Sequence, residues 1–283
     1  MIKKSILFSA LLMGGFTGVF AIKISSVAEL IEQIGSNKTL ELEPGLYNLT
    51  KVAEAYNPHI EWVNNHDGYE PIISNVNNLS IVGAGNTQIV IEPRYAWVMN
   101  FVNCNNIRFS NLILGHTEAG YCMGGVLNFE SCSNVTLEKC YLYGSGTVGL
   151  MADKCNNLSL VDSEIYECTY GLAYLYNSNN IRFEKTTFRN TGGFDLVEIM
   201  SCNSVTFKSC RFTDNFNGEF LPHFFTIDAN LWNNNGSVTS SSAIQVEKCM
   251  FMNNKVQKFA NDESKISLKG NKFKNNTFST PGK

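Results

Sequence analysis

The chain has 283 residues, of which 44% are hydrophobic, 12% are aromatic and 17% are charged, with a formal net charge of -3. The apolar and aromatic content excludes a disordered chain and is enough to build a substantial core. The near-neutral charge and the lack of a Lys/Arg cluster argue against nucleic acid as a partner, because a phosphate backbone is bound by a basic surface.

The N-terminus has the pattern of an export signal. Lys3 and Lys4 precede an apolar stretch, and the small residues Val19 and Ala21 fit a cleavage site. The sequence therefore predicts a signal peptide over residues 1–21 and an exported protein, periplasmic or extracellular. An uncleaved membrane anchor is the alternative, but the stretch is short for a span, which needs roughly 20 predominantly apolar residues. No later segment is long and apolar enough, so no transmembrane segment is expected after signal cleavage.

Residues 22–70 are expected to form an N-terminal cap. Ser25–Ile34 is predicted as an amphipathic helix, with Ser26 and Glu29 forming a capping box. Residues 39–49 alternate apolar and polar side chains as a strand does, and contain a Pro-Gly turn. A short helix here would cover the end of a stack of strands, which otherwise exposes apolar core and unpaired strand edges.

A repeated motif of the form small-Asn-Asn-apolar-x-apolar runs through the rest of the chain. Its first apolar residue, the anchor, recurs every 23 to 28 residues. The anchors are Leu79, Ile107, Val135, Leu158, Ile181 and Val205, with weaker copies at Ile244 and Ile266. Other apolar columns keep the same register, two and seven residues after the anchor and six residues before it. Each unit therefore contains short strands separated by turns rich in Asn, Gly and Ser.

A unit of this length cannot bury its own apolar positions, but stacked units can, with strands of successive turns roughly 4.8 Å apart. The sequence therefore predicts an all-β, single-domain right-handed parallel β-helix of about eight rungs over residues 71–283, with a short N-terminal capping helix. The repeats, the P-G-x-Y turn at Pro44–Tyr47 and the segment IVGAGN at Ile81–Asn86 resemble the pectate-lyase-like superfamily, the pectin lyase fold, over nearly all of the mature chain.

The resemblance implies this fold and neither of the best-known activities of the superfamily. Polygalacturonase-like members carry an Asp-Asp pair and a Gly-His-Gly signature, whereas this chain has no Asp-Asp pair, and Thr117 follows its Gly-His. The Arg-x-Pro-x-x-Arg run of pectate lyases is also missing from the sequence. Function must therefore be argued from the site.

Columns of Asn and Cys are predicted to be structural. Asn tolerates the left-handed conformation of a tight turn, and stacked amides can form a ladder. Cys alternates with Ser and Thr, as expected at small buried sites. The Asn column contains Asn78, Asn106, Asn134, Asn157 and Asn180, and the Cys columns contain Cys104, Cys132, Cys155 and Cys202, and Cys140, Cys210 and Cys249. Cys122 and Cys168 lie outside both columns and are either a disulfide pair or free thiols.

The outward positions of the strand before each Asn turn form a polar and aromatic face, on which a long polymer could lie. Seven residues before the anchors lie Asn100, Asn128, Met151, Tyr174 and Glu198, and five residues before them lie Val102, Glu130, Asp153, Tyr176 and Met200. The predicted substrate-binding residues are Asn100, Asn128, Tyr176 and Glu198.

Glu130 and Asp153 are expected to lie on neighbouring rungs with their carboxyl groups roughly 5 Å apart, a spacing that suits the acid and nucleophile of a retaining glycosidase. The same pair could bind Ca²⁺ through hard oxygen ligands, or could be a solvated surface pair. Tyr174 could stack on a sugar or act as a phenolic base, and His116 could assist catalysis. No cofactor is required, and Ca²⁺ is the metal that this pair could hold.

Two long excursions interrupt the repeat, and binding groups often sit on such loops. The first spans residues 115–126, and from it project His116, Glu118 and Tyr121. The second spans residues 215–242 and contains His223, Asp228 and Trp232. The second excursion could wall the outward face or shield the coil.

Two functions remain open at this point. One is a secreted protein that binds or degrades an extracellular polysaccharide on the outward strand face, and as an enzyme it would be a polysaccharide lyase or a glycoside hydrolase. The other is a non-catalytic surface or envelope module for scaffolding or adhesion. The acidic and aromatic face favours the first, and the lack of a recognised catalytic signature favours the second.

Overall fold

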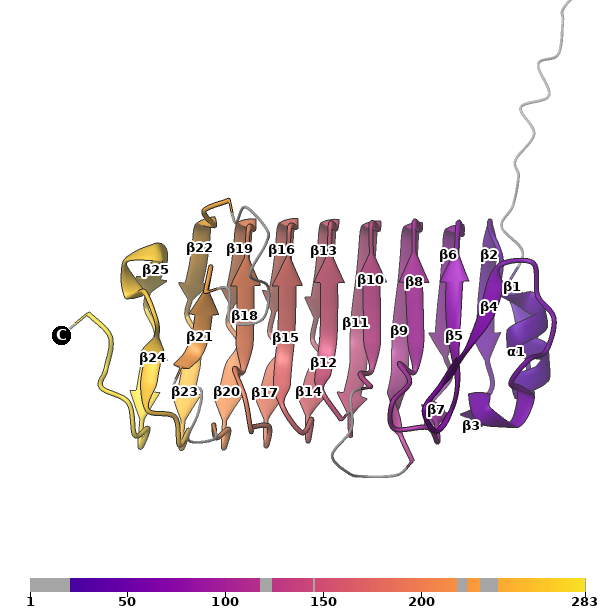
Figure 1. Ribbon diagram of the computed structural model, residues 1–283, viewed down its shortest axis with the longest axis horizontal. Coiled ribbons are helices and arrows are strands. Elements are labelled where there is room, and N and C mark those ends of the chain that lie inside the picture. The colour runs from indigo at the N-terminus through magenta and orange to yellow at the C-terminus, as the bar shows by residue number, and fades with distance from the viewer. Residues whose placement is uncertain (1–20, 118–123, 145, 218–222, 230–238, 283) are drawn as a thin grey trace, which may run out of the picture.

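The computed structural model describes residues 21–117, 124–144, 146–217, 223–229 and 239–282. These residues wind into a single right-handed parallel β-helix of about eight turns, with helix α1 at one end and the C-terminus at the other (Figure 1). The predicted fold class is therefore confirmed. Apart from Ala21, the predicted signal peptide lies outside the described residues. Within the described ranges, no helix is long and apolar enough to cross a membrane.

One face of the β-helix is a nine-stranded sheet. Its strands are parallel except β4 and β5, which form an antiparallel hairpin at the N-terminal end. They are β4 (Ile60–Asn65), β5 (Gly68–Ser74), β8 (Met99–Val102), β10 (Leu127–Glu130), β12 (Val148–Asp153), β15 (Gly171–Tyr176), β18 (Val197–Met200), β21 (His223–Ile227) and β24 (Lys258–Ala260). The expected boundary between cap and coil at residue 70 falls inside β5.

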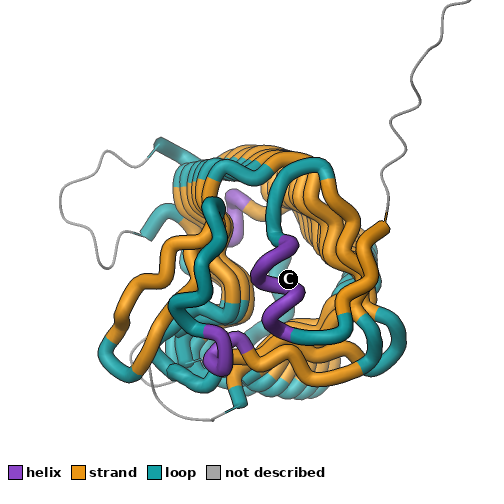
Figure 2. The backbone as a smooth tube through the Cα atoms, turned by 90° about the vertical axis from the view of Figure 1, so that its right-hand side faces the viewer, coloured by secondary structure: helices purple, strands orange, loops and turns teal. Residues whose placement is uncertain are grey.

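The remaining faces belong to one seventeen-stranded sheet that bends around the β-helix (Figure 2). Most turns contribute two short strands to it, whereas β9 and β11 run through both positions without a break. The strands are β1 (Ala21–Ile24), β2 (Lys38–Leu42), β3 (Gly45–Asn48), β6 (Asn77–Gly83), β7 (Thr87–Ile91), β9 (Asn105–His116), β11 (Ser133–Tyr143), β13 (Asn156–Val161), β14 (Glu164–Tyr166), β16 (Asn179–Glu184), β17 (Thr187–Arg189), β19 (Asn203–Lys208), β20 (Arg211–Thr213), β22 (Ser242–Glu247), β23 (Met250–Met252), β25 (Ile266–Lys269) and β26 (Lys272–Lys274).

The register of the sequence repeat is the register of the sheet. The anchor Leu158 of β13 pairs with Val135 of β11 on one side and with Ile181 of β16 on the other. On the nine-stranded sheet, Phe129 pairs with Phe101 and Ala152 in the same way. All of these side chains are buried, so each turn continues the core of the turn before it.

Phenylalanine rings form much of the core in the C-terminal half. Phe188, Phe212 and Phe251 of successive turns stack with ring centroids 4.8 and 4.6 Å apart, and Phe183 stacks on Phe207 at 4.8 Å. All five rings are fully buried. Such aromatic pairs contribute roughly 0.5–1.5 kcal/mol beyond the area that they bury, so the stacks stabilise both the core and the register of the turns.

The Asn column forms the structural ladder that the sequence predicts. Asn78 and Asn106 have φ angles of 57° and 55°, in the left-handed region that Asn tolerates. The Asn106 amide donates to Oδ1 of Asn78 at 2.8 Å, and the Asn157 amide donates to Oδ1 of Asn134 at 3.1 Å. The ladder is not strictly regular, because the Asn134 amide donates to Asn105 instead.

The two Cys columns lie at buried corners, and their seven thiols are free. The backbone N–H of Cys104 donates to Sγ of Cys132 at 3.4 Å, and the N–H of Cys155 donates to Oγ of Ser178 at 2.9 Å. A small side chain with an acceptor atom thus satisfies the corner N–H of the preceding turn. This requirement explains why Cys and Ser replace one another in the column.

Cys168 lies outside the two Cys columns, as the sequence predicts. It lies at a third corner, where its N–H donates to Oγ1 of Thr191 at 3.2 Å. The N–H of Thr191 then donates to Asn215, and that of Asn215 to Asn254. This column mixes Cys, Thr and Asn and lies where the turns vary most in length, so the sequence repeat does not reveal it. Cys122 lies outside the described residues.

Helix α1 (Val27–Gln33) lies across the N-terminal end of the coil, as predicted (Figure 2). The Ser26 hydroxyl accepts a hydrogen bond from the Glu29 N–H, but the Glu29 carboxylate accepts from the N–H of Ser25 rather than that of Ser26. The single strand expected over residues 39–49 is instead two strands, β2 and β3, followed by the 3₁₀ helix η1 (Leu49–Val52). A second 3₁₀ helix, η2 (Glu263–Lys265), precedes β25.

Candidate functional site

The two predicted outward columns lie on the nine-stranded sheet, with their members paired in register. One column runs through Asn100, Asn128, Met151, Tyr174, Glu198 and Thr226, and the other through Val102, Glu130, Asp153, Tyr176 and Met200. Burial alternates along β10, where Leu127 and Phe129 are buried and Asn128 and Glu130 are partly exposed. On β15 and β18 the outward positions Tyr174 and Glu198 are buried as well. These two columns, which we call the outward face, follow the long axis of the β-helix.

Glu130 and Asp153 are neighbours in register on β10 and β12, as predicted. Oδ1 of Asp153 accepts a hydrogen bond from the Asn177 amide at 2.8 Å, and its Oδ2 lies 3.4 Å from the Lys154 ammonium. These partners already satisfy much of the Asp153 carboxylate. Among the described residues, no group of three or more His, Cys, Asp or Glu side chains is placed to hold a metal ion. The catalytic and Ca²⁺-binding roles of this pair stay predictions.

Several groups whose pKa values are raised lie further along the same face. Tyr174, Tyr176, Asp195, Glu198 and Thr226 form what we call the acid–tyrosine cluster. The Tyr176 hydroxyl donates to Oε2 of Glu198 at 2.5 Å, and Thr226 is the register partner of Glu198. The ring of Tyr174 lies over Gly171, where an added Cβ would come within 2.5 Å of that ring. A glycine at residue 171 therefore makes room for a buried tyrosine.

Burial controls the electrostatics of this cluster. Glu198 is 7% exposed, and loss of solvent raises its pKa to about 7, although the hydrogen bond from Tyr176 opposes the shift and Asp195 adds to it. Asp195 is 0% exposed, and burial raises its pKa as well. The pKa values of both tyrosines are raised by burial and by the charge of Glu198. Glu198 can therefore gain or lose a proton near neutral pH, which is what acid–base chemistry requires.

Three unsatisfied polar atoms lie in this cluster. In the described part of the chain, five buried side-chain atoms have no hydrogen-bond partner within ordinary limits: Oδ1 and Oδ2 of Asp195 and Oγ1 of Thr226 in the cluster, Oδ1 of Asn128 three strands away on β10, and Nδ1 of His116 on the other sheet. Thr226 lies beside Asp195, and its hydroxyl opposes the effect of burial on the pKa of Asp195. Because buried polar groups are nearly always paired, the cluster is a candidate site for water or a ligand.

The predicted binding residues Asn100 and Asn128 extend this arrangement toward the N-terminal end. The Asn128 amide donates to Oδ1 of Asn100 at 3.0 Å, and the Asn100 amide donates to Oε1 of Glu70 at 3.0 Å. Glu70 is buried and also accepts hydrogen bonds from Asn65 and from the Trp97 N–H. This chain of hydrogen bonds leaves the oxygen of Asn128 as its unused end.

His116 lies elsewhere than the sequence suggested. It does not project from the loop but ends β9, where it pairs with Ile91 on the seventeen-stranded sheet. It is 3% exposed, its Nε2 lies 2.9 Å from the carbonyl oxygen of Ala96, and burial lowers its pKa. The catalytic role of His116 stays a prediction, and this position favours a structural role at the corner. Glu118 and Tyr121 lie outside the described residues.

Part of the second excursion has a structural role. Asp228 is anchored by hydrogen bonds from the N–H groups of Ser201 and Ser241, and its carboxylate lies 2.5 Å from the Lys265 ammonium. It therefore fastens the chain between β21 and β22. His223 begins β21, and burial lowers its pKa. Trp232 lies outside the described residues.

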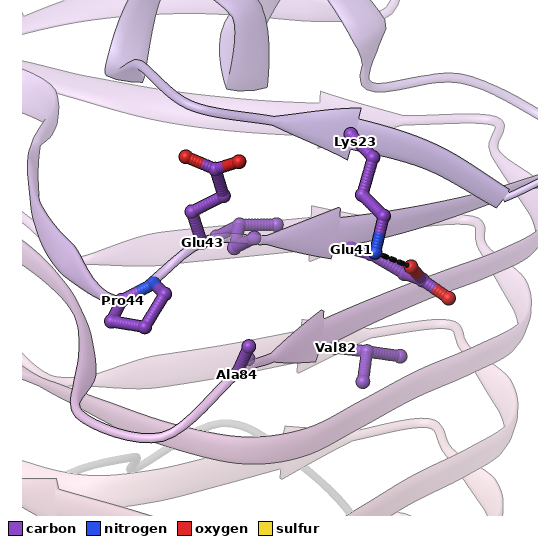
Figure 3. Close-up of a pocket in the computed structure, with 8 residues that line it drawn as sticks. Lys23, Glu41, Glu43, Pro44, Val82 and Ala84 are labelled. Atoms are coloured by element: carbon purple, nitrogen blue, oxygen red, sulfur yellow. Dashed lines mark ion pairs between the residues drawn. The ribbon is translucent and has the colours of Figure 1, made fainter.

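Two pockets lie away from the outward face. One, of about 260 Å³, opens over β1, β2 and β6, where Lys23 and Glu41 form an ion pair of 2.5 Å beside Glu43 and Pro44 (Figure 3). The other, of about 510 Å³, is lined by Asp214, Asn215, Phe216, Asn217, Asn253 and Lys255. Neither includes the acid–tyrosine cluster, in which Tyr174, Glu198 and Thr226 are buried, whereas the outward-face side chains of β8, β10 and β12 are partly exposed.

The sequence repeat predicted Asn100, Asn128 and Glu198 as residues of the site, but it did not predict Asp195 or Thr226. Thr226 continues the column of Glu198, and aligning β21 with the repeat would have identified it. Asp195 lies in the corner before β18, outside every repeat column. Only its burial in the folded chain distinguishes it from an ordinary loop acid.

The sequence and the fold were compared with known proteins. Residues 63–223, more than half of the chain, match the family described as right handed beta helix region. No match is found among curated proteins. Similar solved structures include a pectate lyase from Bacillus sp. N165 in complex with trigalacturonate, at 13% identity and a TM-score of 0.57, covering 92% of this chain and 84% of that chain.

Two further structures illustrate the range of proteins with this fold. Polygalacturonase from Erwinia carotovora ssp. carotovora is 12% identical, with a TM-score of 0.54 and coverage of 92% of this chain and 85% of that chain. PfbA, a surface adhesin of Streptococcus pneumoniae, is 12% identical, with a TM-score of 0.52 and coverage of 93% and 74%. At such identities the likeness shows the fold alone.

Proposed function

Because the chain belongs to the right-handed β-helix family, we propose that it is an exported protein that binds an extracellular polysaccharide along its outward face. The observation that carries the proposal is the continuous row of Asn, Tyr and carboxylate side chains, paired in register from β8 to β18. Export through the predicted signal peptide at residues 1–21, into a periplasm or the exterior, belongs to the same proposal.

The geometry suits a linear polymer. Strands of successive turns lie roughly 4.8 Å apart and run parallel, so a chain lying along the axis meets an equivalent outward position at every turn. Amide and carboxyl groups can hydrogen-bond to sugar hydroxyls, and tyrosine combines an apolar ring with a polar tip. A site built on strands holds these groups more precisely than one built on loops.

Cleavage of the bound polymer is the second part of the proposal. Glu130 and Asp153 would act as acid and base or nucleophile, or as Ca²⁺ ligands, with Tyr174 and His116 assisting. Two of the similar structures are a pectate lyase and a polygalacturonase, which supports polysaccharide chemistry on this fold without assigning it here. Glu198, with a pKa of about 7, is a further candidate acid.

An adhesion module is the second candidate function. It is supported by the partners of Asp153, which occupy one of the two proposed catalytic carboxylates, and by the surface adhesin that shares the fold. In this case the outward face would bind a surface glycan without cleaving it.

The test is a glycan screen of the protein expressed from its full sequence, with and without Ca²⁺. Products are followed both as new reducing ends and as unsaturated sugars that absorb in the ultraviolet. The Glu130→Gln/Asp153→Asn variant reports on the predicted pair, the Tyr176→Phe/Glu198→Gln variant on the acid–tyrosine cluster, and Glu138→Gln on β11 is a matched control on the other sheet. Product that forms with the unmodified protein and disappears in one of the two outward-face variants establishes an enzyme. Binding without product establishes an adhesion module. If the protein binds no glycan, the proposal is refuted.

A further inference from the structure

The charge of the outward face is one-sided. The two columns carry the carboxyl groups of Glu130, Asp153 and Glu198, with Asp195 buried beside the last of these. No Lys or Arg occupies either column between β8 and β18 in the described structure. The nearest basic group with a recorded contact is the Lys154 ammonium, and it is already paired with Asp153. A polymer with a carboxylate on each sugar would therefore meet repulsion at successive turns.

The unpartnered atoms of this face are mainly hydrogen-bond acceptors. Both oxygens of Asp195 lie in the acid–tyrosine cluster beside the Thr226 hydroxyl, and Oδ1 of Asn128 lies three strands away on β10. Asp195 is completely buried, and its neighbours Glu198, Tyr174 and Tyr176 all respond to its charge. A ligand rich in hydroxyl donors complements such a site, whereas a ligand that brings further carboxylate acceptors does not.

From these two observations we infer that the outward face selects an uncharged glycan over a polyuronate, with the acid–tyrosine cluster as its central subsite. The partly exposed side chains of Asn128 and Tyr176 would meet the sugar on this face, and the ring of Tyr176 offers it an apolar surface. The selection rests on the proposed function, since it names the class of polysaccharide bound. It differs from the pectate lyase with bound trigalacturonate, a charged oligosaccharide, that shares the fold.

The cluster also has a reason to prefer a neutral ligand at neutral pH. Burial raises the pKa of Glu198 to about 7, so bringing another negative charge close to this carboxyl would oppose its ionisation further. An uncharged sugar can accept a hydrogen bond from the protonated form or donate one to the ionised form. A neutral glycan can therefore hydrogen-bond to Glu198 in either protonation state, whereas a uronate carboxylate is repelled by the ionised form.

Affinity electrophoresis of the full-length expression product tests the inference. The gels contain neutral polymers (xylan, galactan and glucomannan) or polyuronates (polygalacturonate and alginate), each with Ca²⁺ and with a chelator. The expected result is retardation by at least one neutral polymer with an affinity at least about tenfold above that for either polyuronate. Equal or tighter binding to a polyuronate overturns the inference and leaves the proposed function standing. No retardation by any polymer refutes the proposed function, and the inference with it.

Variants test the two physical causes separately. Tyr176→Phe and Glu198→Gln keep the shape of the cluster and remove a donor or a charge, and each is expected to weaken neutral-glycan binding by about tenfold, the value of one well-placed hydrogen bond. Glu138→Gln, on the other sheet, is the matched control and should bind as the unmodified protein does. The Glu130→Gln/Asp153→Asn variant is expected to bind polyuronates more tightly. If this variant has unchanged selectivity, the argument from charge is wrong. If Tyr176→Phe and Glu198→Gln bind neutral glycans as the unmodified protein does, the acid–tyrosine cluster is not the subsite.

Discussion

Replacing Glu198 by glutamine tests whether this carboxyl is buried as the structure shows. Glu198 is 7% exposed, and burial raises its pKa from 4.5 to about 7 in the folded protein. The unfolded chain therefore loses this proton at a lower pH than the folded protein does. Glutamine has nearly the same shape, keeps an oxygen to accept the Tyr176 hydroxyl, and carries no charge at any pH.

The sign and size of the effect follow from linkage. Below pH 4.5 both states hold the proton, and Glu198 carries no penalty. Between pH 4.5 and 7 the folded state holds more protons than the unfolded state, so the free energy of unfolding falls as the pH rises. Each unit of pKa difference corresponds to about 1.4 kcal/mol, so the elevated pKa lowers stability by about 3 kcal/mol above pH 7. The Glu198→Gln variant is expected to recover about 2 to 3 kcal/mol at pH 8 and almost nothing at pH 4.

The assay is urea denaturation at a series of pH values from 4 to 8, followed by tryptophan fluorescence and by circular dichroism. Asp195, whose pKa is also raised by burial, remains in both proteins, so the informative quantity is the difference between their free energies of unfolding. The Glu138→Gln variant on β11 serves as the control, and its free energy of unfolding should equal that of the unmodified protein at each pH. Parallel pH profiles for the unmodified protein and Glu198→Gln would show that Glu198 is solvated, contrary to the structure.

Two further predictions concern the core. Phe212→Ala removes a ring from the stack and is expected to lower the free energy of unfolding by about 3 to 5 kcal/mol, whereas Phe216→Ala, at a side chain that is 49% exposed, should change it by less than about 0.5 kcal/mol; urea denaturation compares them, and equal losses would contradict the core assignment. The seven thiols of the two Cys columns are expected to react with a thiol reagent only after unfolding, because they are buried and burial raises the pKa of Cys140 to about 12. Spectrophotometric titration compares the folded and denatured protein, and rapid labelling of more thiols than the two outside these columns, Cys122 and Cys168, would show that the corners are open.

The fold could be predicted from the sequence because a β-helix repeats its constraints at every turn. A single apolar residue such as Leu158 says little, but its alignment with Val135 and Ile181 reveals which positions face inward. Asn in the left-handed corner and small acceptor side chains at the next corner add independent marks of the same register. Because several columns predict the same alignment, one atypical residue does not change it, and the predicted register agrees with the strand pairing of the sheet.

Prediction failed where the repeat changes length. His116 was expected on a loop because the excursion at residues 115–126 lengthens its turn, yet β9 continues through the bend as far as His116 and buries the ring. Asp195 lies just before β18, in the segment between β17 and β18 that no column of the repeat covers. The orientation of a side chain at such a corner depends on how the loop packs, and no column of the repeat constrains it.

The contrast between the corners and the acid–tyrosine cluster is the strongest argument for function in this fold. At the Cys and Thr corners, small side chains accept the N–H groups of neighbouring turns, so the described solenoid satisfies its internal polar groups with side chains of the simplest kind. Asp195 and Thr226 depart from this rule within one short stretch of the outward face. A buried carboxyl without a donor lowers stability, and alanine or leucine would fill the same space at no such cost. The packing of the turns does not require two buried acids at one place, which is the reason to look for function there.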